Sequence, residues 1–299
     1  MKIFYGLMHK KIDVTQICLN KLTRNNFIKI PSGDLNRAHF FTDPIYGIRK
    51  KIFILNDDVL TDYDESYTIL IHIIDNTIHT ISNLDIDSRL ENIHSKLLIN
   101  YGDFTEELPE QKMVARYLTG NENVLEIGSN IGRNSLVIAH ILSLHNNHNF
   151  VTLECNPNIA KQLAENRDLN HLSFHIETAA LSNRKLIQRG WDTKVSDVLL
   201  DDYNWVDTVT LKQLQDKYNI TFDTLILDCE GAFYYILIDM PQILQNINLI
   251  IMENDYWDYN HKLYIDNVLK QNNFFVDYSE SGGWGPCFNN FFEVWKKQT

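Results

Sequence analysis

The segment VLEIGSNIGRNS, residues 124–135, decides the fold of this chain. It starts as a short apolar strand, carries an acid at Glu126, and passes through Gly128 and Gly132 into a helical pattern. A glycine turn between a strand and a helix is typical of open α/β sheets, which bind ligands at the carboxyl ends of their strands. The segment therefore predicts a ligand site at the carboxyl end of a central strand.

The residues after 122 alternate between strand and helix patterns. This alternation predicts βαβ units and an α/β, Rossmann-like, mostly parallel sheet. The last two strands are close enough along the chain to form an antiparallel hairpin at the sheet edge. The expected strands are 124–127, 150–153, 172–176, 224–227, 248–252, 273–278 and 291–295, and the expected helices are 132–144, 158–168, 232–239 and 260–271.

The preceding part of the chain has a different texture. Residues 1–82 read as short β segments separated by turn signals, which predicts a β-rich accessory domain in the form of a meander or small sandwich. Apolar residues at helical spacing follow, so 83–120 is expected to be a helical connector. The Rossmann-like domain is then expected at 121–299.

Composition excludes several classes of function. The 39 acidic residues outnumber the 27 basic ones, for a net charge of −12, which opposes binding to nucleic acid or to an anionic membrane. The four cysteines show no metal-finger spacing, and the start of the chain lacks the apolar core of a signal peptide. The longest apolar runs have the length of strands. A cytoplasmic protein is expected.

Two acids indicate which ligand the glycine turn takes. A dinucleotide fingerprint needs a third glycine, which is missing after Gly132. Glu126 would repel a pyrophosphate, whereas Glu154, at the end of the next strand, is placed to accept hydrogen bonds from ribose hydroxyls. Acids on both sides of the turn fit S-adenosylmethionine, which carries a sulfonium and an ammonium group.

Further residues join the expected cofactor site. Small residues after the third strand leave room for a planar adenine, although an ordinary tight turn explains them equally well. Besides Glu126 and Glu154, the candidates for cofactor binding are Gly128, Ser129, Asn130, Gly132, Asn134, Cys155, Ala179, Ala180 and Asp228.

The segment LDCEG, residues 227–231, is the expected reaction centre. If the strand extends through Asp228 and Glu230, both carboxylates point to one face, where they could hold a hydroxyl, take its proton or bind a cation. Glu253, at the end of the next strand, is the third candidate catalytic residue. A magnesium ion on Asp228 and Glu230 is an open alternative, because the spacing shows no full ligand set.

Four residues are candidates for holding the acceptor substrate. Asn254 follows Glu253, and Trp284 lies between glycines that could form either a lid or a plain hairpin turn. Arg189 and Trp191 belong to a long connection that could equally be a packed surface loop.

The chain resembles the FkbM-type class I S-adenosylmethionine-dependent methyltransferases over residues 100–296. The resemblance rests on VLEIGSNIGRNS, on the segment leading into LDCEGAF and on IIMEND. It implies a Rossmann-like sheet with a reversed last strand. It also implies that Glu126, Gly128, Gly132 and Glu154 contact the cofactor, with Asp228 and Glu230 at the methyl-transfer centre. The first 80 residues and the segment around Arg189 lie outside it.

These observations predict an S-adenosylmethionine-dependent O-methyltransferase that acts on a small-molecule hydroxyl, with a sugar, nucleotide sugar or glycan as the expected acceptor. One alternative is a catalytically inactive, methyltransferase-like glycan-binding or scaffold protein. A nicotinamide-dependent oxidoreductase is the other alternative. The β-rich domain could mediate homodimer formation.

Overall fold

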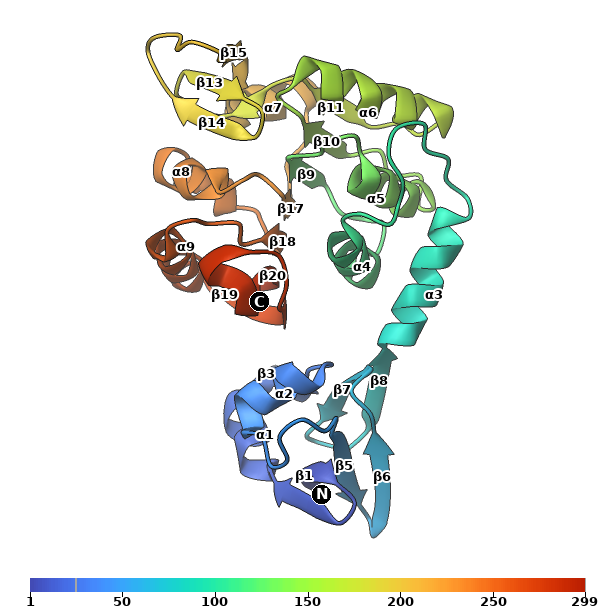
Figure 1. Cartoon of the computed structure of the whole chain (residues 1–299). Helices are drawn as coiled ribbons and strands as arrows, with labels where there is room; N and C mark the ends of the chain where they lie inside the picture. The colour runs from blue at the N-terminus through green and yellow to red at the C-terminus, as the bar shows by residue number, and fades with distance from the viewer. Residues whose placement is uncertain (25, 299) are drawn as a thin grey trace. The chain divides into compact units, whose positions relative to one another are not determined.

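The computed structural model describes residues 1–24 and 26–298 and divides into two compact units, Met1–Arg89 and Leu90 to the end of the chain (Figure 1). The boundary falls within helix α3 (Asn83–His94), which precedes α4 (Leu108–Tyr117). The separate helical connector expected at 83–120 stays a prediction about chain organisation.

The large unit is built on one sheet whose strand order, over the described residues, is β11-β10-β9-β17-β18-β20-β19. The first five of these strands are parallel, and β20 runs antiparallel to both of its neighbours. The expected Rossmann-like, mostly parallel sheet with a reversed last strand is therefore confirmed. The strands are β9 (Val124–Ile127), β10 (Phe150–Leu153), β11 (His175–Glu177), β17 (Thr224–Leu227), β18 (Leu249–Glu253), β19 (Phe274–Glu280) and β20 (Phe292–Lys297).

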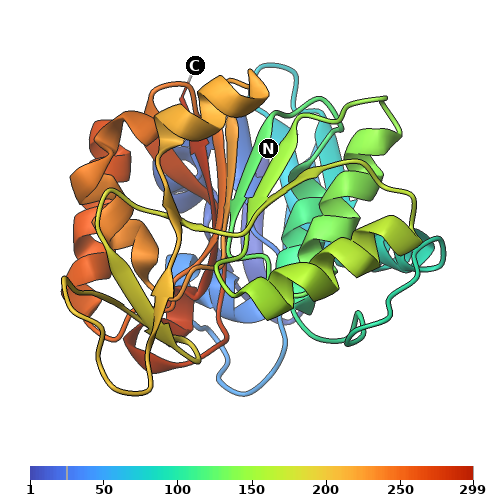
Figure 2. The same cartoon turned by 90° about the horizontal axis from the view of Figure 1, so that it is seen from above.

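Helices cover both faces of this sheet. The green helices α5 and α6 lie on one face, and the orange to red helices α8 and α9 lie on the other (Figure 2). Every residue of β9, β10 and β17 is consequently buried, which is why these strands read as short apolar runs without polar alternation. The helices are α5 (Arg133–Ser143), α6 (Pro157–Leu169), α7 (Leu211–Tyr218), α8 (Ala232–Asp239) and α9 (Tyr259–Gln271), with short 3-10 helices at Pro241–Leu244 and Gly285–Asn290.

The connection before α7 contains structure that the sequence pattern did not reveal. Three antiparallel strands form a small sheet there, and two others pair in parallel. Helix α7 starts with a capping box between Thr210 and Gln213, a signal that the sequence carried. The strands are β12 (Ala180–Leu181), β13 (Leu186–Arg189), β14 (Asp192–Val195), β15 (Asn204–Val206) and β16 (Thr208–Val209).

The small unit is β-rich, as expected, but it also contains two helices, so the prediction of β segments alone was incomplete. Its described residues form two four-stranded antiparallel sheets, ordered β2-β1-β5-β6 and β3-β4-β7-β8, around a shared isoleucine-rich core. Helices α1 (Thr15–Lys21) and α2 (Asp34–Phe41) add Cys18 and Phe41 to this core. The strands are β1 (Lys2–Leu7), β2 (Lys10–Asp13), β3 (Thr23–Arg24), β4 (Phe27–Ile30), β5 (Lys51–Asn56), β6 (Val59–Tyr63), β7 (Tyr67–His72) and β8 (Ile78–Ser82).

None of the helices in the described part of the chain combines the length and the apolar character needed to cross a membrane.

A buried ion pair anchors α9 to the reversed strand. Lys262 Nζ lies 2.8 Å from Glu293 Oε2 and also pairs with Asp266. The same Glu293 oxygen accepts hydrogen bonds from the Trp295 indole at 3.0 Å and the Asn254 amide at 3.1 Å. Removing the lysine would leave Glu293 buried among donors but without its cation.

We expect Lys262→Met to lower the free energy of unfolding by about 3–5 kcal/mol, because it leaves an uncompensated buried charge. Urea unfolding followed by tryptophan fluorescence measures this loss. Lys212→Met is the matched control, since Lys212 pairs with Asp216 on the surface and should contribute below about 1 kcal/mol. Equal losses in the two variants would contradict a special role for the buried pair.

Candidate functional site

The glycine turn joins the ends of the two central strands. Gly128 has a φ of 84°, and a Cβ placed on it would lie 1.6 Å from the carbonyl oxygen of Asp228. Its N–H donates to the Leu153 carbonyl at 3.1 Å. Only glycine permits both the left-handed backbone and this close approach, so Gly128 fixes where the ends of β9, β10 and β17 meet.

Glu154 holds the turn from the neighbouring strand. Its side chain is buried, and its two carboxylate oxygens accept hydrogen bonds from the backbone N–H groups of Asn130, at 3.0 Å, and Asn156, at 2.7 Å. Burial raises the pKa of this carboxyl, while the two N–H groups oppose the rise. Glu154 therefore stands at the carboxyl end of β10, where an acid was expected to meet ribose hydroxyls.

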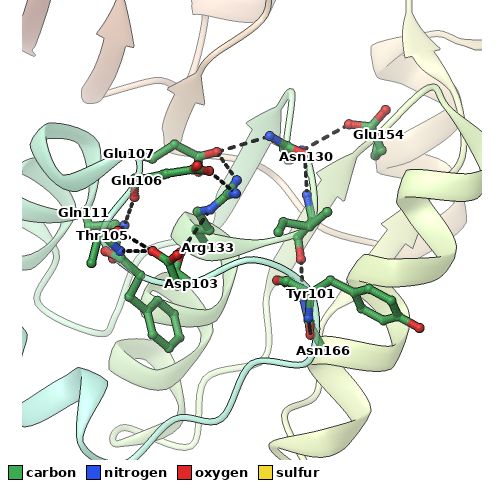
Figure 3. A network of polar contacts seen from close by, with 12 residues as sticks. Tyr101, Asp103, Thr105, Glu106, Glu107, Gln111, Asn130, Arg133, Glu154 and Asn166 are labelled. Carbon is green, nitrogen blue, oxygen red and sulfur yellow. Dashed lines mark hydrogen bonds and ion pairs between the residues drawn. The ribbon is translucent and has the colours of Figure 1, made fainter.

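An arginine clamp closes the other side of the turn (Figure 3). Arg133 donates from Nε to the Asp103 carbonyl at 3.0 Å and from Nη1 to Glu107 Oε1 at 2.9 Å, and it also pairs with Glu106. Figure 3 shows Asn130 between Glu107 and Glu154, and its amide donates to Glu107 at 3.2 Å. The segment before α4 is thereby packed against the glycine turn.

A group of acids gathers where β9, β17 and β18 end, and we call it the acid cluster: Glu107, Glu110, Asp228, Glu230 and Asp255. Burial is the main cause that raises the pKa of Asp228, followed by the charges of the four other members. Burial likewise raises the pKa of Glu110 and of Asp255 to about 7. Among the described residues, Arg133 neutralises Glu107, but no cation pairs with Glu110, Asp228 or Asp255.

Four buried acceptor atoms at this edge of the sheet have no donor among the described residues. They are Glu110 Oε2, Asn134 Oδ1, Asn254 Oδ1 and Asp255 Oδ2. Buried polar atoms are nearly always hydrogen-bonded in folded proteins. Acceptors without donors, next to carboxylates without cations, suit a ligand that carries hydrogen-bond donors and positive charge.

Sequence reasoning missed Glu107, Glu110 and Asp255. Glu107 and Glu110 belong to the acidic run EELPE, which reads as the solvated start of a helix. Asp255 directly follows two residues that were chosen. The sequence did contain a signal for Asp255, because this residue follows the end of a strand, as Glu154 and Asp228 do.

Glu126 lies inside the unit, with 1% of its surface exposed. Its Oε2 accepts hydrogen bonds from Ser135 on α5 at 2.5 Å and from Thr152 on β10 at 2.7 Å. Burial raises its pKa to about 7, and both hydroxyl groups act against the rise. These bonds join β9 to β10 and α5, and a direct contact between Glu126 and a ligand stays a prediction.

The expected reaction-centre residues fall in different surroundings. Strand β17 ends at Leu227, so Asp228 and Glu230 do not share a strand face, and the geometric reason for pairing them was wrong. Glu230 is exposed, with a left-handed φ of 50°. Glu253 is half-buried at the end of β18, and Asn254 is fully buried. The electrostatic coupling of Asp228 to Glu230 and Asp255 still places these carboxyls at one sheet edge.

The remaining cofactor candidates line the same ends of β9, β10 and β11. Ser129 donates to the Leu153 carbonyl at 3.2 Å, and a Cβ on Gly132 would lie 2.2 Å from a methyl group of Leu163. Cys155 is half-buried and accepts a hydrogen bond from Gln188 at 3.2 Å. Ala179 is buried and Ala180 begins β12.

The acceptor candidates separate into two places. Arg189 ends β13 and lies 4.9 Å from the centre of the Tyr203 ring, while Trp191 is 61% exposed in the hairpin turn. Trp284 lies between β19 and β20, with its ring centre 4.3 Å from that of Trp257. Trp257 was not a sequence candidate.

The structure also bears on a metal and on an alternative pocket. Across the described residues, no three His, Cys, Asp or Glu side chains are grouped so that they could hold a metal ion.

A cavity of about 510 Å³ lies at the opposite edge of the sheet, against Phe222 and Ile247, which precede β17 and β18. Ligands of open α/β sheets bind at the carboxyl edge, so the candidate site is the glycine turn with the acid cluster.

No family model and no curated protein matches the sequence. Similar solved structures include an O-methyltransferase from Bacillus cereus in complex with S-adenosylhomocysteine, at 17% identity and a TM-score of 0.41 over 71% of this chain and 91% of that one. A ribosomal protein L11 methylase from Lactobacillus delbrueckii has 12% identity and a TM-score of 0.40 over 67% and 82%. M. jannaschii TYW2 in complex with AdoMet has 14% sequence identity and a TM-score of 0.36, over 80% of this chain and 91% of that one. The strand order and register of the large sheet define its fold class.

The raised pKa values predict how stability depends on pH. Glu110, Glu126 and Asp255 keep their protons to about pH 7 in the folded state, whereas unfolded carboxyls release them near pH 4. Their contribution is therefore complete below the unfolded pKa and is lost as pH rises through about 7. We expect the free energy of unfolding of the wild-type chain to be lower at pH 8 than at pH 5.

Glu110→Gln should reduce this difference by up to about 3 kcal/mol, because its pKa is about 7 instead of 4.5. Denaturant unfolding at the two pH values measures it. Glu91→Gln, on the exposed side of α3, is the control and should keep the wild-type slope. A Glu110 variant as pH-sensitive as the wild type would show that Glu110 is ionised in the folded protein.

Proposed function

We propose that this protein is an S-adenosylmethionine-dependent methyltransferase that methylates the hydroxyl group of a small molecule. One observation carries the proposal. The glycine turn lies between Glu154 on one side and, on the other, an acid cluster in which Glu110, Asp228 and Asp255 have no cation among the described residues. A ligand with a ribose and two positive centres matches both sides.

The positions of these residues favour one orientation of such a cofactor. Glu154, at the end of β10, would accept the ribose hydroxyls, as the corresponding acid does in related α/β folds. Glu107 and Glu110 would receive the ammonium group, because Glu110 Oε2 is a buried acceptor without a donor among the described residues. The small side chains of Ala179 and Ala180 would leave room for the adenine, and Asp228 would belong to the methyl-transfer centre.

The cofactor supplies an electrophilic methyl group on a sulfonium. The chain aligns the acceptor oxygen with that group and receives the proton that the hydroxyl loses. Alignment in a bound complex can supply roughly 7–11 kcal/mol of the barrier, and a positioned base adds about 10²–10⁴-fold. Asp228, Glu230 and Glu253 are the sequence-based candidates for this centre, and magnesium at Asp228 and Glu230 stays an untested alternative.

The finer parts of the proposal rest on the sequence resemblance. Membership in the FkbM-type family and a sugar, nucleotide sugar or glycan as acceptor are inferred from VLEIGSNIGRNS, LDCEGAF and IIMEND. The cytoplasmic location and a homodimer through the small unit are inferred from composition and from the β-rich segment.

Two alternatives make different demands on the site. A nicotinamide-dependent oxidoreductase would bring a pyrophosphate to a turn that lacks the third glycine and lies beside the acid cluster, where charge repulsion opposes it. An inactive scaffold would have no use for buried acids without partners, since each one lowers stability.

The first test is ligand-dependent stability. S-adenosylhomocysteine at 100 times its dissociation constant should stabilise the chain by about 2.7 kcal/mol and raise its melting temperature, whereas NAD should not. Differential scanning fluorimetry measures both. Stabilisation by NAD and not by S-adenosylhomocysteine would disprove the methyltransferase proposal.

A second test addresses the ammonium group. Glu110→Gln should weaken binding of S-adenosylhomocysteine about 10-fold, because a charge-assisted hydrogen bond contributes roughly 1.5–3 kcal/mol. Methylthioadenosine lacks the amino-acid end, so its affinity should change less than about twofold. Isothermal titration calorimetry compares both ligands, with Glu91→Gln as the control. Equal weakening for both ligands would place Glu110 away from the ammonium group.

A further inference from the structure

The loops at the edge of the sheet beyond β17 contain aromatic and acidic residues that have no part in the proposed cofactor binding. Strand β18 ends there, and so does β19, because β19 and β18 are both antiparallel to β20 and therefore run the same way. The pairing of Glu253 with Phe292, and of Phe292 with Glu280, puts the two strand ends at the same level. The loops that follow them are therefore neighbours.

Two tryptophans lie on these neighbouring loops, and Trp284 is half-buried. Trp257 follows β18 and is 84% exposed, and Trp284 follows β19. Their ring centres are 4.3 Å apart at an interplanar angle of 43°, and Phe291 lies behind Trp284 at 6.5 Å. The Trp257 ring is exposed at the edge of the sheet where ligands bind. An exposed aromatic surface of this kind suits contact with the apolar face of a ligand ring.

A buried amide holds the two loops together. Asn254 donates its backbone N–H to the Phe291 carbonyl and its side-chain amide to the Asn290 carbonyl, both at 2.7 Å. Tyr256 fills the space between the turns, since Cβ atoms on Gly231 and Gly285 would lie 3.6 and 3.7 Å from its atoms. The two loops that carry Trp257 and Trp284 are therefore held together by hydrogen bonds and by packing.

Asp255 lies between Asn254 and Tyr256 in the chain, and its carboxyl group is a candidate to receive a proton from the acceptor. It is 5% exposed, and its Oδ1 accepts the N–H of Gly231 at 2.9 Å. Its Oδ2 is buried and has no donor among the described residues. One oxygen is thus fixed by the turn after β17, and the other is free to accept a proton or a hydrogen bond.

The other carboxyls are less suited to an acceptor hydroxyl. Glu230 is exposed, so water screens it. Asp228 shares its surroundings with Glu107 and Glu110 on the cofactor side of the cluster. Asp255 follows β18, which is one strand farther from β9.

We infer that Trp257, Trp284 and Asp255 form the acceptor site, in which the tryptophan pair stacks on the apolar face of an uncharged sugar ring and Asp255 takes the hydroxyl proton. Of the acceptors proposed above, this inference keeps the uncharged sugar or glycan and excludes the nucleotide sugar, because the acid cluster would repel its phosphate groups. This inference rests on the proposed methyltransferase function.

The acceptor oxygen forms a bond to the methyl carbon, and the carbon–sulfur bond breaks with its electron pair going to sulfur. The hydroxyl proton passes to Asp255 Oδ2. The products are a methyl ether, neutral S-adenosylhomocysteine and a protonated carboxyl, which then releases its proton to water. Because the sulfonium charge disappears during the step, the carboxylate becomes more basic as the proton arrives.

The test uses saturation-transfer NMR on the full chain with S-adenosylhomocysteine bound. The probes are the methyl glycosides of glucose, galactose, mannose, rhamnose, fucose and N-acetylglucosamine, with methyl 4-hydroxybenzoate as a planar phenol. We expect at least one glycoside to receive saturation on its ring protons. Trp257→Ala and Trp284→Ala should weaken its binding roughly 3- to 10-fold, while Trp205→Ala, an exposed tryptophan on β15, should not.

Asp255 is tested with the same glycoside and S-adenosylmethionine. Asp255→Asn keeps an oxygen for Gly231, so glycoside and S-adenosylhomocysteine binding should persist while kcat falls about 10²-fold or more. Methyl transfer is followed by mass spectrometry.

Several outcomes would overturn the inference while S-adenosylhomocysteine still binds: no saturation of any glycoside, binding of the phenol alone, or loss of binding in Trp191→Ala but not in Trp257→Ala. An unchanged kcat in Asp255→Asn would do the same for the proton acceptor. Failure of S-adenosylhomocysteine to bind the wild-type chain would instead remove the proposed function itself.

Discussion

The close approach between Gly128 and the carbonyl oxygen of Asp228 is the constraint on which the rest of the site depends. A side chain at residue 128 would lie 1.6 Å from that oxygen, so the two central strands can end side by side only with glycine there. This contact sets the position of the turn between the acids that follow β10 and those that follow β17. The proposed recognition of the cofactor would thus follow from a steric requirement of the backbone.

Charge is distributed around this contact in an uneven way. Arg133 and the backbone N–H groups compensate Glu107 and Glu154, whereas Glu110 and Asp255 are buried without donors for one of their oxygens. Such carboxyls destabilise the folded chain when they ionise, and a cationic ligand would remove that penalty. The proposed cofactor and the stability of the chain are therefore linked through the same groups.

Much of the large unit could be predicted from local sequence. Strands 124–127, 150–153 and 224–227 match the structure residue for residue, because strands covered on both faces read as short apolar runs between turns. The seven- and eight-residue helices of the small unit were missed because they are brief and are stabilised by packing into its core. The small sheet at 186–206 was missed for a related reason, since β14 is exposed throughout and shows no apolar alternation.

By itself the sequence determined the glycine turn, the order of the strands of the large sheet and the acids at the strand ends, since each is encoded by residue type at short spacing. Only the tertiary structure decided which acids meet, because Glu107, Glu110, Asp228 and Asp255 come from three separate segments of the chain. It also decided that Asp228 and Glu230 do not share a strand face and that Trp257 lies against Trp284. Burial and neighbouring charge, which set the protonation of these acids, arise only when distant segments pack together.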